Sequence, residues 1–379
     1  MPGVGGRIYF GTWRSEEVKM KILTVLGARP QFIKASPVSK ALKQEGFEEI
    51  LVHTGQHFDA NMSQIFFDEM GIAKPHYNLN IHGLSHAAMT GKMLVEIEKI
   101  LEDEKPNAVL VYGDTNSTLA GALAAAKLHL PVAHVEAGLR SFNQAMPEEI
   151  NRIVTDRISK FLFCPTDTAV SHLKKEGFAS LPEVFIEKTG DVMYDALIQF
   201  GKLAEESSSV IKKHQLSPEN FVLCTIHRQE NTDNPQRLEG ILDALIEIGK
   251  STMIVFPVHP RTLPLLSKIK NNPAFILIEP VGYLDMLSLL KNCKLVVTDS
   301  GGLQKEAFMS RKYCITCRDE TEWVELVDAG VNKLCGSMPE QIISAYQYFS
   351  EISFSSTSEF YGKGKASQEI AVFLKNHLK

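Results

Sequence analysis

The chain has 379 residues, a net charge of −5 at pH 7 and 44% hydrophobic residues. At about 150 residues per domain, this length predicts two domains, and the composition suits packed cores rather than a disordered chain. The modest negative charge, without any Lys/Arg cluster, argues against a nucleic-acid partner. Because the longest apolar runs are strand-sized, we expect no membrane partner and a cytoplasmic protein.

The cysteines and the N-terminal residues carry no chemistry of their own. Six cysteines are scattered, mostly in apolar runs, which favours reduced thiols in the core. Cys314 and Cys317 have CxxC spacing, but they fall in a predicted strand without a second such pair, so we expect no metal or redox role. Residues 1–19 hold no apolar segment of signal-peptide length, and we expect a loose extension there.

Strands and helices alternate between residues 20 and 190. The predicted strands are Lys21–Leu26, Ile50–Thr54, Ala108–Tyr112, Pro131–Val135, Lys160–Cys164 and Val184–Glu187. The predicted helices are Pro30–Glu45, Asn61–Met70, Ser85–Glu104, Ser117–Leu128 and Pro147–Ile158. Because the strands are rich in Val, Ile and Leu, they should form a parallel sheet covered on both faces. We therefore predict an N-terminal Rossmann-like domain over 20–190, with a hinge at Thr189–Asp191.

A second alternating series predicts a C-terminal Rossmann-like domain over 191–362, followed by a C-terminal helix within 363–379. The predicted strands are Phe221–Thr225, Thr252–Pro257, Phe275–Ile278, Lys294–Thr298, Tyr313–Thr316 and Val331–Leu334. The predicted helices are Pro235–Gly249, Leu263–Ile269, Tyr283–Lys291, Leu303–Met309, Thr321–Ala329, Pro339–Phe349 and Ser367–His377. The fold class is α/β, with two doubly wound domains that face a central cleft. The strand count exceeds the eight of a single barrel.

Three acids converge on one predicted sheet edge. Asp114 and Glu136 come directly after neighbouring strands, and Glu148 follows a proline at the start of the next helix. Parallel strands deliver such residues to one crevice at their carboxyl ends, and Arg140 and Arg152 lie close by in sequence. A single acid in a first helical turn can serve merely as a favourable charge. For three acids together, a functional site is the better interpretation.

The first predicted strand ends in a short turn that favours an anion. Gly27 permits the turn and Pro30 starts a helix, and we expect free N–H groups in the turn to favour a negative ligand. Arg29 and Lys34 lie where a phosphate or sugar could be held, although surface solvation is an equal alternative for each alone. The turn is not a GxGxxG, so no nicotinamide or flavin cofactor is indicated.

The second half offers a similar site. Ser300, Gly301 and Gly302 follow a strand and open a helix, where glycines let backbone N–H groups approach a pyrophosphate. Glu306, one turn further on, is placed to reach ribose hydroxyls. His227 follows another strand and is a candidate to support a leaving phosphate, with a structural histidine as the alternative.

Together these segments resemble the non-hydrolysing UDP-N-acetylglucosamine 2-epimerases, from Met20 to near the C-terminus. The matching segments are Gly27–Lys34, Gly113–Thr118, His134–Arg140, Pro147–Arg152, His227–Arg228 with Glu230–Asn231, and Thr298–Glu306. The resemblance implies a two-lobed GT-B-like architecture, a homodimer, and no metal or redox cofactor. It also implies inversion of C2 of a UDP-2-acetamido sugar, typically UDP-GlcNAc to UDP-ManNAc, for surface polysaccharide synthesis.

The resemblance implies roles for individual residues. Positions that match the catalytic cleft of the family are Arg29, Lys34, Asp114, Glu136, Glu148 and His227. Positions that match its UDP site are Ser300, Gly301, Gly302 and Glu306. We add Arg152, His259, Arg318 and Trp323 as substrate-binding candidates. Elimination of UDP to a glycal avoids a C2 carbanion, and carboxylates beside the ring suit its oxocarbenium-like state and the C2 proton.

Two departures from the family pattern leave the sugar open. Trp323 stands where the family usually has an arginine that faces the substrate, although a large ring can equally be a packing residue. The segment 54–63 departs from one that in many members binds an activating UDP-GlcNAc, which puts self-activation in doubt. Together with the segment Gln304–Ala307, which contains Lys305, these two departures resemble the branch that epimerises UDP-2,3-diacetamido-2,3-dideoxy-glucuronic acid for O-antigen synthesis.

Three other activities would fit parts of this pattern. A GT-B glycosyltransferase would share the fold and the nucleotide site, but it would consume an acceptor. A hydrolysing 2-epimerase would release free sugar and UDP. A sugar-nucleotide sensor would bind without turnover, and convergent acids in a cleft argue against it.

Overall fold

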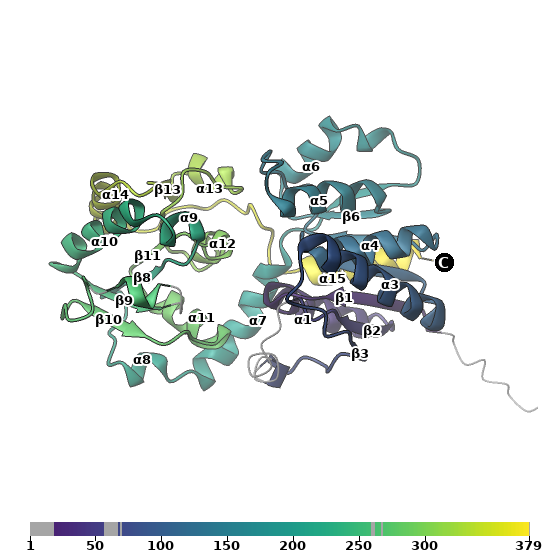
Figure 1. Ribbon diagram of the computed structural model, residues 1–379, viewed down its shortest axis with the longest axis horizontal. Coiled ribbons are helices and arrows are strands. Elements are labelled where there is room, and N and C mark those ends of the chain that lie inside the picture. Colours follow the sequence, from purple (N-terminus) through teal and green to yellow (C-terminus); the bar gives the residue numbers. More distant parts are fainter. Residues whose placement is uncertain (1–18, 57–66, 69, 259–261, 267, 379) are drawn as a thin grey trace, which may run out of the picture.

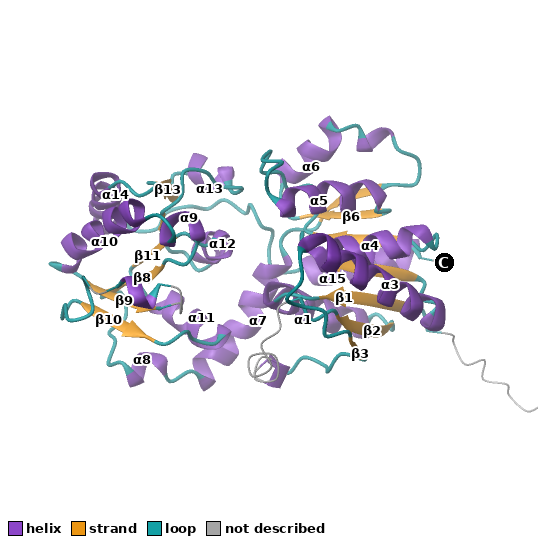
Figure 2. Ribbon diagram, in the orientation of Figure 1, coloured by secondary structure: helices purple, strands orange, loops and turns teal. Residues whose placement is uncertain are grey.

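The computed structural model describes residues 19–56, 67–68, 70–258, 262–266 and 268–378. It contains two parallel sheets, each with helices on both faces (Figures 1 and 2). The predicted α/β class with two doubly wound, GT-B-like halves is confirmed. Among the described residues, no helix is both long enough and apolar enough to cross a bilayer.

The first sheet has the strand order β3-β2-β1-β4-β5-β6-β7, and every described pairing in it is parallel. Its strands are β1 (Lys21–Leu26), β2 (Glu48–His53), β3 (Tyr77–Asn78), β4 (Ala108–Tyr112), β5 (Val132–Val135), β6 (Phe161–Cys164) and β7 (Phe185–Lys188). The accompanying helices are α1 (Arg29–Gln44), α3 (His86–Glu104), α4 (Asn116–Lys127), α5 (Pro147–Ile158) and α6 (Asp167–Lys175), with a 3-10 turn η1 (Phe178–Ser180).

The second sheet has the equivalent order β10-β9-β8-β11-β12-β13, again parallel. Its strands are β8 (Phe221–Thr225), β9 (Met253–Pro257), β10 (Phe275–Ile278), β11 (Leu295–Thr298), β12 (Cys314–Thr316) and β13 (Asn332–Leu334). From α7 onward, the helices along the chain are α7 (Val192–Ser207), α8 (Val210–Lys213), α9 (Gln229–Thr232), α10 (Pro235–Gly249), α11 (Tyr283–Asn292), α12 (Gly301–Met309), α13 (Val324–Asp328), α14 (Pro339–Glu351) and α15 (Ala366–His377), with a 3-10 turn η2 (Leu263–Leu265).

Alternation of side chains divides the first core into two layers. Leu23 and Val25 of β1 pack with α3 and α4 in one cluster, whereas Ile22 and Leu26 belong to the cluster that contains α1 and α15. This period of two is what a strand covered on both faces requires. Helix α15 therefore belongs to the first sheet in space, as Figure 1 shows, although it ends the chain.

The structure differs from the sequence predictions at a few elements. Helix α7 begins directly after the predicted hinge, where the side chain of Asp191 caps it by accepting from Met193 N at 2.8 Å. The helix predicted at Leu263–Ile269 is instead the 3-10 turn η2, which contains Pro264. The helix predicted at Asn61–Met70 lies mostly outside the described residues. Strand β3, with two residues, was too short to predict.

Candidate active site

The candidate site lies where the strand order reverses in each sheet. Chain order changes direction between β1 and β4 in the first sheet and between β8 and β11 in the second. Ligands of open α/β sheets bind in the crevice at these points, beyond the carboxyl ends of the strands. Arg29 and Asp114 follow β1 and β4, and His227 and Ser300 follow β8 and β11. Four predicted residues thus come from the two switch points.

Gln31 fastens the turn after β1, and its hydrogen bonds contradict the expectation that free N–H groups in this turn favour an anion. Its side-chain oxygen accepts from Gly27 N at 2.8 Å and Ala28 N at 3.0 Å. These two N–H groups are therefore engaged within the protein and are not available to an anion. The Gln31 amide nitrogen donates to Tyr112 O at 2.7 Å, which ties the β1 turn to the end of β4. The turn thus positions Arg29, which lines the cavity of about 280 Å³ described below.

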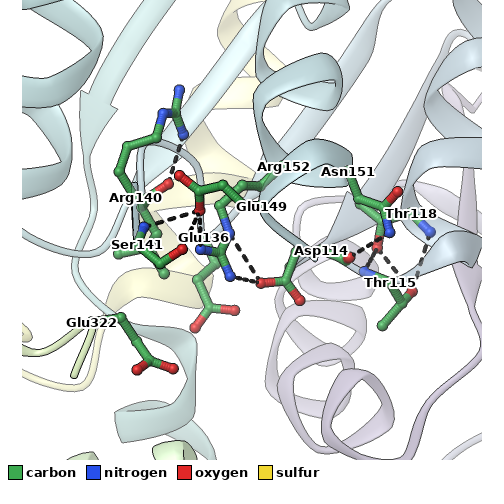
Figure 3. A network of polar contacts seen from close by, with 12 residues as sticks. Asp114, Thr115, Thr118, Glu136, Arg140, Ser141, Glu149, Asn151, Arg152 and Glu322 are labelled. Carbon is green, nitrogen blue, oxygen red and sulfur yellow. Dashed lines mark hydrogen bonds and ion pairs between the residues drawn. The ribbon is translucent and has the colours of Figure 1, made fainter. Parts of the chain in front are cut away.

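Asp114 is held by Arg152 at the first sheet's edge. The Nε of Arg152 donates to Asp114 Oδ2 at 3.1 Å, a second contact comes from Nη2, and Nη1 donates to Glu149 at 2.6 Å. Figure 3 shows Arg152 reaching between these two acids. Glu149 also accepts from Ser141 N at 2.9 Å. Burial raises the pKa of Glu149, but hydrogen bonds from Ser141 and the charge of Arg152 outweigh it, so its pKa is lowered overall.

A cavity of about 510 Å³ joins the two halves at this point. From the first half it is lined by Asp114, Met146, Glu148 and Arg152, and from the second half by Arg228, Gln229, Glu230 and Glu322. Two of the three predicted acids, Asp114 and Glu148, therefore face one space. Its lining holds four carboxylates and two guanidinium groups. Such a space suits a neutral, hydroxyl-rich ligand that donates hydrogen bonds.

The third predicted acid, Glu136, lies between two lysines. Its carboxylate contacts Lys34 Nζ through Oε2 and accepts from Lys305 Nζ at 2.9 Å through Oε1. Burial raises the pKa of Glu136, but the two ammonium groups outweigh that effect and hold its pKa well below the ordinary value. Its backbone has a φ of 73°, in the left-handed region that side-chain-bearing residues rarely adopt. This strained conformation at a strand end is typical of functional positions.

A second cavity, of about 280 Å³, collects the predicted nucleotide residues. Its lining includes Arg29, His227, Ser300 and Glu306 together with Thr225 and Pro257. Asp299 fixes this wall, because its carboxylate accepts from His227 N at 3.0 Å and Arg228 N at 2.9 Å. A cation from the first half thus faces a helix N-terminus in the second, which is a suitable arrangement for a diphosphate.

The side chains of Ser300, Thr321 and Trp323, which lie outside α12, stabilise its N-terminal turn. Ser300 caps it by accepting from Leu303 N at 3.4 Å. The indole N–H of Trp323 donates to Gly301 O at 2.9 Å, and Gln304, fully buried, accepts from Thr321 at 2.8 Å. A Cβ at Gly302 would meet nothing within 4 Å, so the backbone there is open to a ligand. These contacts fix the turn that the sequence predicts as a pyrophosphate site.

Glu306 is buried beside this turn. Burial raises its pKa from 4.5 to about 7, although Tyr283 hydrogen-bonds to it and lowers the value in part. The residue is only 8% exposed, yet it lines the cavity that collects the predicted nucleotide residues. A carboxyl poised near neutrality can accept from paired hydroxyls such as those of ribose.

Trp323, Arg318 and Arg140 are buried and line neither cavity. Trp323 is 5% exposed and packs beneath the Gly301 turn, and Arg318 is buried and donates to Glu322 at 2.8 Å. His259 lies outside the described residues. Arg140 binds Asp156 at 2.7 Å, so it fastens the loop after β5. The role of Trp323 in choosing the sugar stays a prediction.

Sequence reasoning missed several charged residues that organise the site. They are Lys305, Asp191, Asp299, Arg228 and Glu322. Asp299 and Arg228 follow strands, so their position was a usable signal. Lys305 lies inside a helix, where a lysine is ordinarily solvent-exposed and gives no such signal. The six cysteines are buried free thiols, as predicted, and burial raises the pKa of Cys314 to about 12. The described residues contain no cluster arranged to ligate a metal.

Comparison with known proteins agrees with this geometry. A family model described as UDP-N-acetylglucosamine 2-epimerase matches residues 40–375. The chain is 53% identical over 357 residues to the UDP-2,3-diacetamido-2,3-dideoxy-D-glucuronate 2-epimerase of Pseudomonas aeruginosa, covering 94% of this chain and 99% of that protein. A crystal structure of Methanocaldococcus jannaschii UDP-GlcNAc 2-epimerase with UDP-GlcNAc and UDP matches with a TM-score of 0.84 and 44% identity, over 94% of this chain and 100% of that one.

A more distant structure resembles the chain in fold alone. This glycosyltransferase of lipopolysaccharide biosynthesis has a TM-score of 0.59 and 10% identity, over 93% of this chain and 99% of that one. Fold, site and close relatives together define a nucleotide-sugar 2-epimerase, an isomerase. The chain belongs to the non-hydrolysing UDP-N-acetylglucosamine 2-epimerase family.

Proposed function

We propose that the protein inverts C2 of UDP-GlcNAc to give UDP-ManNAc, through elimination and re-addition of UDP. The observation that carries this proposal is a pair of cavities lined by consecutive residues, His227 in one and Arg228 in the other. One presents Asp114 and Glu148 to a sugar-sized space, and the other presents Arg29 and the start of α12 to a diphosphate. A sugar spanning them would place its C1–O bond near the junction.

The reaction balances without an added reactant. The C1–O bond breaks with its electron pair leaving on UDP, a carboxylate takes the C2 proton, and a C1–C2 double bond forms. A second carboxyl group then donates a proton to C2 from the opposite face, and a phosphate oxygen of UDP bonds to C1. Proton exchange with water returns both carboxyl groups to their starting states. The positively charged clamp lowers the cost of the departing diphosphate, and carboxylates stabilise the ring as positive charge develops.

The sugar itself is the finer part of the proposal. The lining of the larger cavity, with four carboxylates and two guanidinium groups, favours UDP-GlcNAc, because a uronate would add a further negative charge. The second candidate is UDP-2,3-diacetamido-2,3-dideoxy-D-glucuronate. The 53% identity to the Pseudomonas aeruginosa enzyme favours it. Arg228 and Arg152 are the cations in the cavity that could receive its carboxylate.

Proton NMR of the protein with each UDP-sugar in deuterated water tests both parts. For the native substrate we expect a new anomeric signal from the C2 epimer, deuterium at C2, and no net release of UDP. Turnover that requires an acceptor would indicate a glycosyltransferase instead, and accumulation of free ManNAc with UDP would indicate hydrolysis. The ratio of kcat/KM for the two UDP-sugars identifies the substrate.

A further inference from the structure

Lys305 joins the two halves of the molecule at the site. It lies on α12, which faces the first half in Figure 1. Its ammonium donates to Glu136 Oε1 at 2.9 Å and to Asp191 Oδ2 at 2.5 Å, and the side chain is 2% exposed. Glu136 ends β5 in the first sheet, and Asp191 caps α7 between the sheets. A buried lysine is costly unless it is paired, and here two carboxylates satisfy it.

Aromatic rings position the ammonium as well. Its nitrogen lies 4.1 Å from the centroid of the Trp323 ring and 6.0 Å from that of Tyr361. Ring faces attract a cation, and Trp323 is the best of them for this purpose. Trp323 is in turn fastened to Gly301, the first residue of α12. The groups that hold the predicted UDP-binding turn therefore also hold Lys305 against Glu136.

The charged groups around Glu136 come from four elements. Lys34 of α1 contacts its other oxygen, so each carboxylate oxygen has its own ammonium. Asp191 shares Lys305 with it. Lys305 is also close enough to interact electrostatically with Glu306, on the same helix, and with Glu325 of α13, which accepts from Tyr361 at 3.0 Å. The two lysines are the groups that bind Glu136 directly.

We propose that Lys305 is a positioning residue for epimerisation, which orients Glu136 as a carboxylate and couples it to the helix that receives UDP. This inference rests on the proposed function. With both oxygens engaged, Glu136 is suited to stabilise positive charge on the sugar ring, and Asp114 and Glu148 are left to move the C2 proton. The 305 position thus contributes to the reaction without touching the substrate.

The first test compares Lys305→Met and Lys305→Arg with Lys312→Met. Lys312 is a matched control, since it is a buried lysine three residues beyond the end of α12 and pairs with Glu219, which lines neither cavity. Lys305→Met should lower kcat by roughly a hundredfold with little change in UDP affinity, and Lys305→Arg should recover part of it. Lys312→Met should keep native kcat. Native kcat in Lys305→Met would overturn the proposal.

The pH profile separates positioning from simple structural support. The lysines lower the pKa of Glu136, so removing one raises it. As the pH falls, the variant should therefore lose the carboxylate, and with it activity, at a higher pH than the native protein does. The acid limb of the kcat profile should move upward by about one pH unit or more. A variant with lower melting temperature but an unmoved acid limb would show a structural role only. If Lys305→Met does not fold, the double variant Lys305→Met with Asp191→Asn replaces it, because the amide removes the buried negative charge that lost its lysine partner.

A double-mutant cycle tests whether Lys305 acts through Glu136. In the Glu136→Gln background, Lys305→Met should cost less than about threefold further in kcat, because coupled residues are non-additive. Losses that multiply would refute the coupling. Carbon-13 NMR of labelled glutamate, with the Glu136 signal assigned by Glu136→Gln, gives a readout without turnover. A Glu136 titration that is unchanged in Lys305→Met refutes the coupling even if the proposed reaction itself is wrong.

Discussion

At the residue scale, Glu306 links the nucleotide cavity to the stability of the protein. Its pKa is about 7 in the folded protein, because burial disfavours its charged form, against 4.5 for an ordinary glutamate. For an acid with a raised folded pKa, the stability contribution is fully present below the unfolded value and is lost as pH rises through the folded value. The contribution of Glu306 to folding stability should therefore be lost between about pH 4.5 and pH 7.

Glu306→Gln removes this pH dependence, because the amide mimics the protonated acid. A shift of this size corresponds to about 3 kcal/mol, so at pH 8 the variant should gain up to that much in unfolding free energy. At pH 5 the gain should be small. Urea unfolding at both values measures it, with the exposed Glu102→Gln as a control whose effect does not change with pH. An equal gain at both values would contradict the assignment.

Substitutions of the three acids should affect turnover much more than they affect nucleotide binding. Changing Asp114, Glu136 or Glu148 to its amide should lower turnover by about a hundredfold or more, the scale of positioned acid–base groups. Binding of UDP, measured by calorimetry, should change much less, since the nucleotide cavity is lined by other residues. Near-native turnover in all three variants would remove the acids from the mechanism.

The position of these acids could be predicted from sequence, whereas their partners could not. Asp114 and Glu136 follow apolar runs, and strand ends in a parallel sheet meet at one edge. Lys305 gives no comparable signal, because a lysine within a helix is ordinarily exposed. Its burial arises only when the two halves meet. Trp323 gives no signal for a different reason: its ring packs on Lys305 of α12, a contact within the second half that sequence spacing does not predict.

At the element scale, α12 depends on a neighbouring segment for its start. The indole N–H of Trp323 is bonded to Gly301 O, and its ring covers Lys305. Trp323→Phe keeps a ring but loses the donor, which should cost about 1 kcal/mol of stability. Because this turn is part of the proposed diphosphate site, UDP affinity should weaken several-fold, and equally for both UDP-sugars. Calorimetry with UDP and kcat/KM for the two substrates measure this.

A changed preference ratio in Trp323→Phe would show instead that the ring reads the sugar directly. Trp323→Arg places a second cation beside Lys305, and like charges at this distance repel. It should therefore be less stable than Trp323→Phe. The comparison separates an effect on the turn from an effect on the sugar.

Elements with strong periodicity were predictable, and elements set by tertiary contacts were not. Strands such as β4 and β8 were predicted at their observed bounds, because they are apolar throughout and bounded by polar residues. Helix α7 was not predicted, although Asp191, at the end of the predicted hinge, is a good N-cap. Strand β3 has only two residues, and its pairing to β2 creates it.

At the scale of the whole molecule, the two halves should close on the nucleotide. Arg29 and the acids belong to one half, and Ser300 and Glu306 belong to the other. A ligand that contacts both sides favours the closed arrangement and excludes water from the glycal. We expect the radius of gyration from solution scattering to fall with saturating UDP. Identical profiles with and without UDP would count against closure.

Helix α15 has a consequence for how the protein is made. It is the last helix of the chain, yet Phe373 packs against Phe161, Phe163 and Phe185 of the first sheet. Chains emerge from the ribosome N-terminus first, and domains usually fold as they emerge. Here the first half lacks part of its apolar cover until the whole second half and α15 have been synthesised. Its folding is therefore completed only after the second half has emerged, and a chain truncated before α15 would expose the aromatic surface that α15 covers.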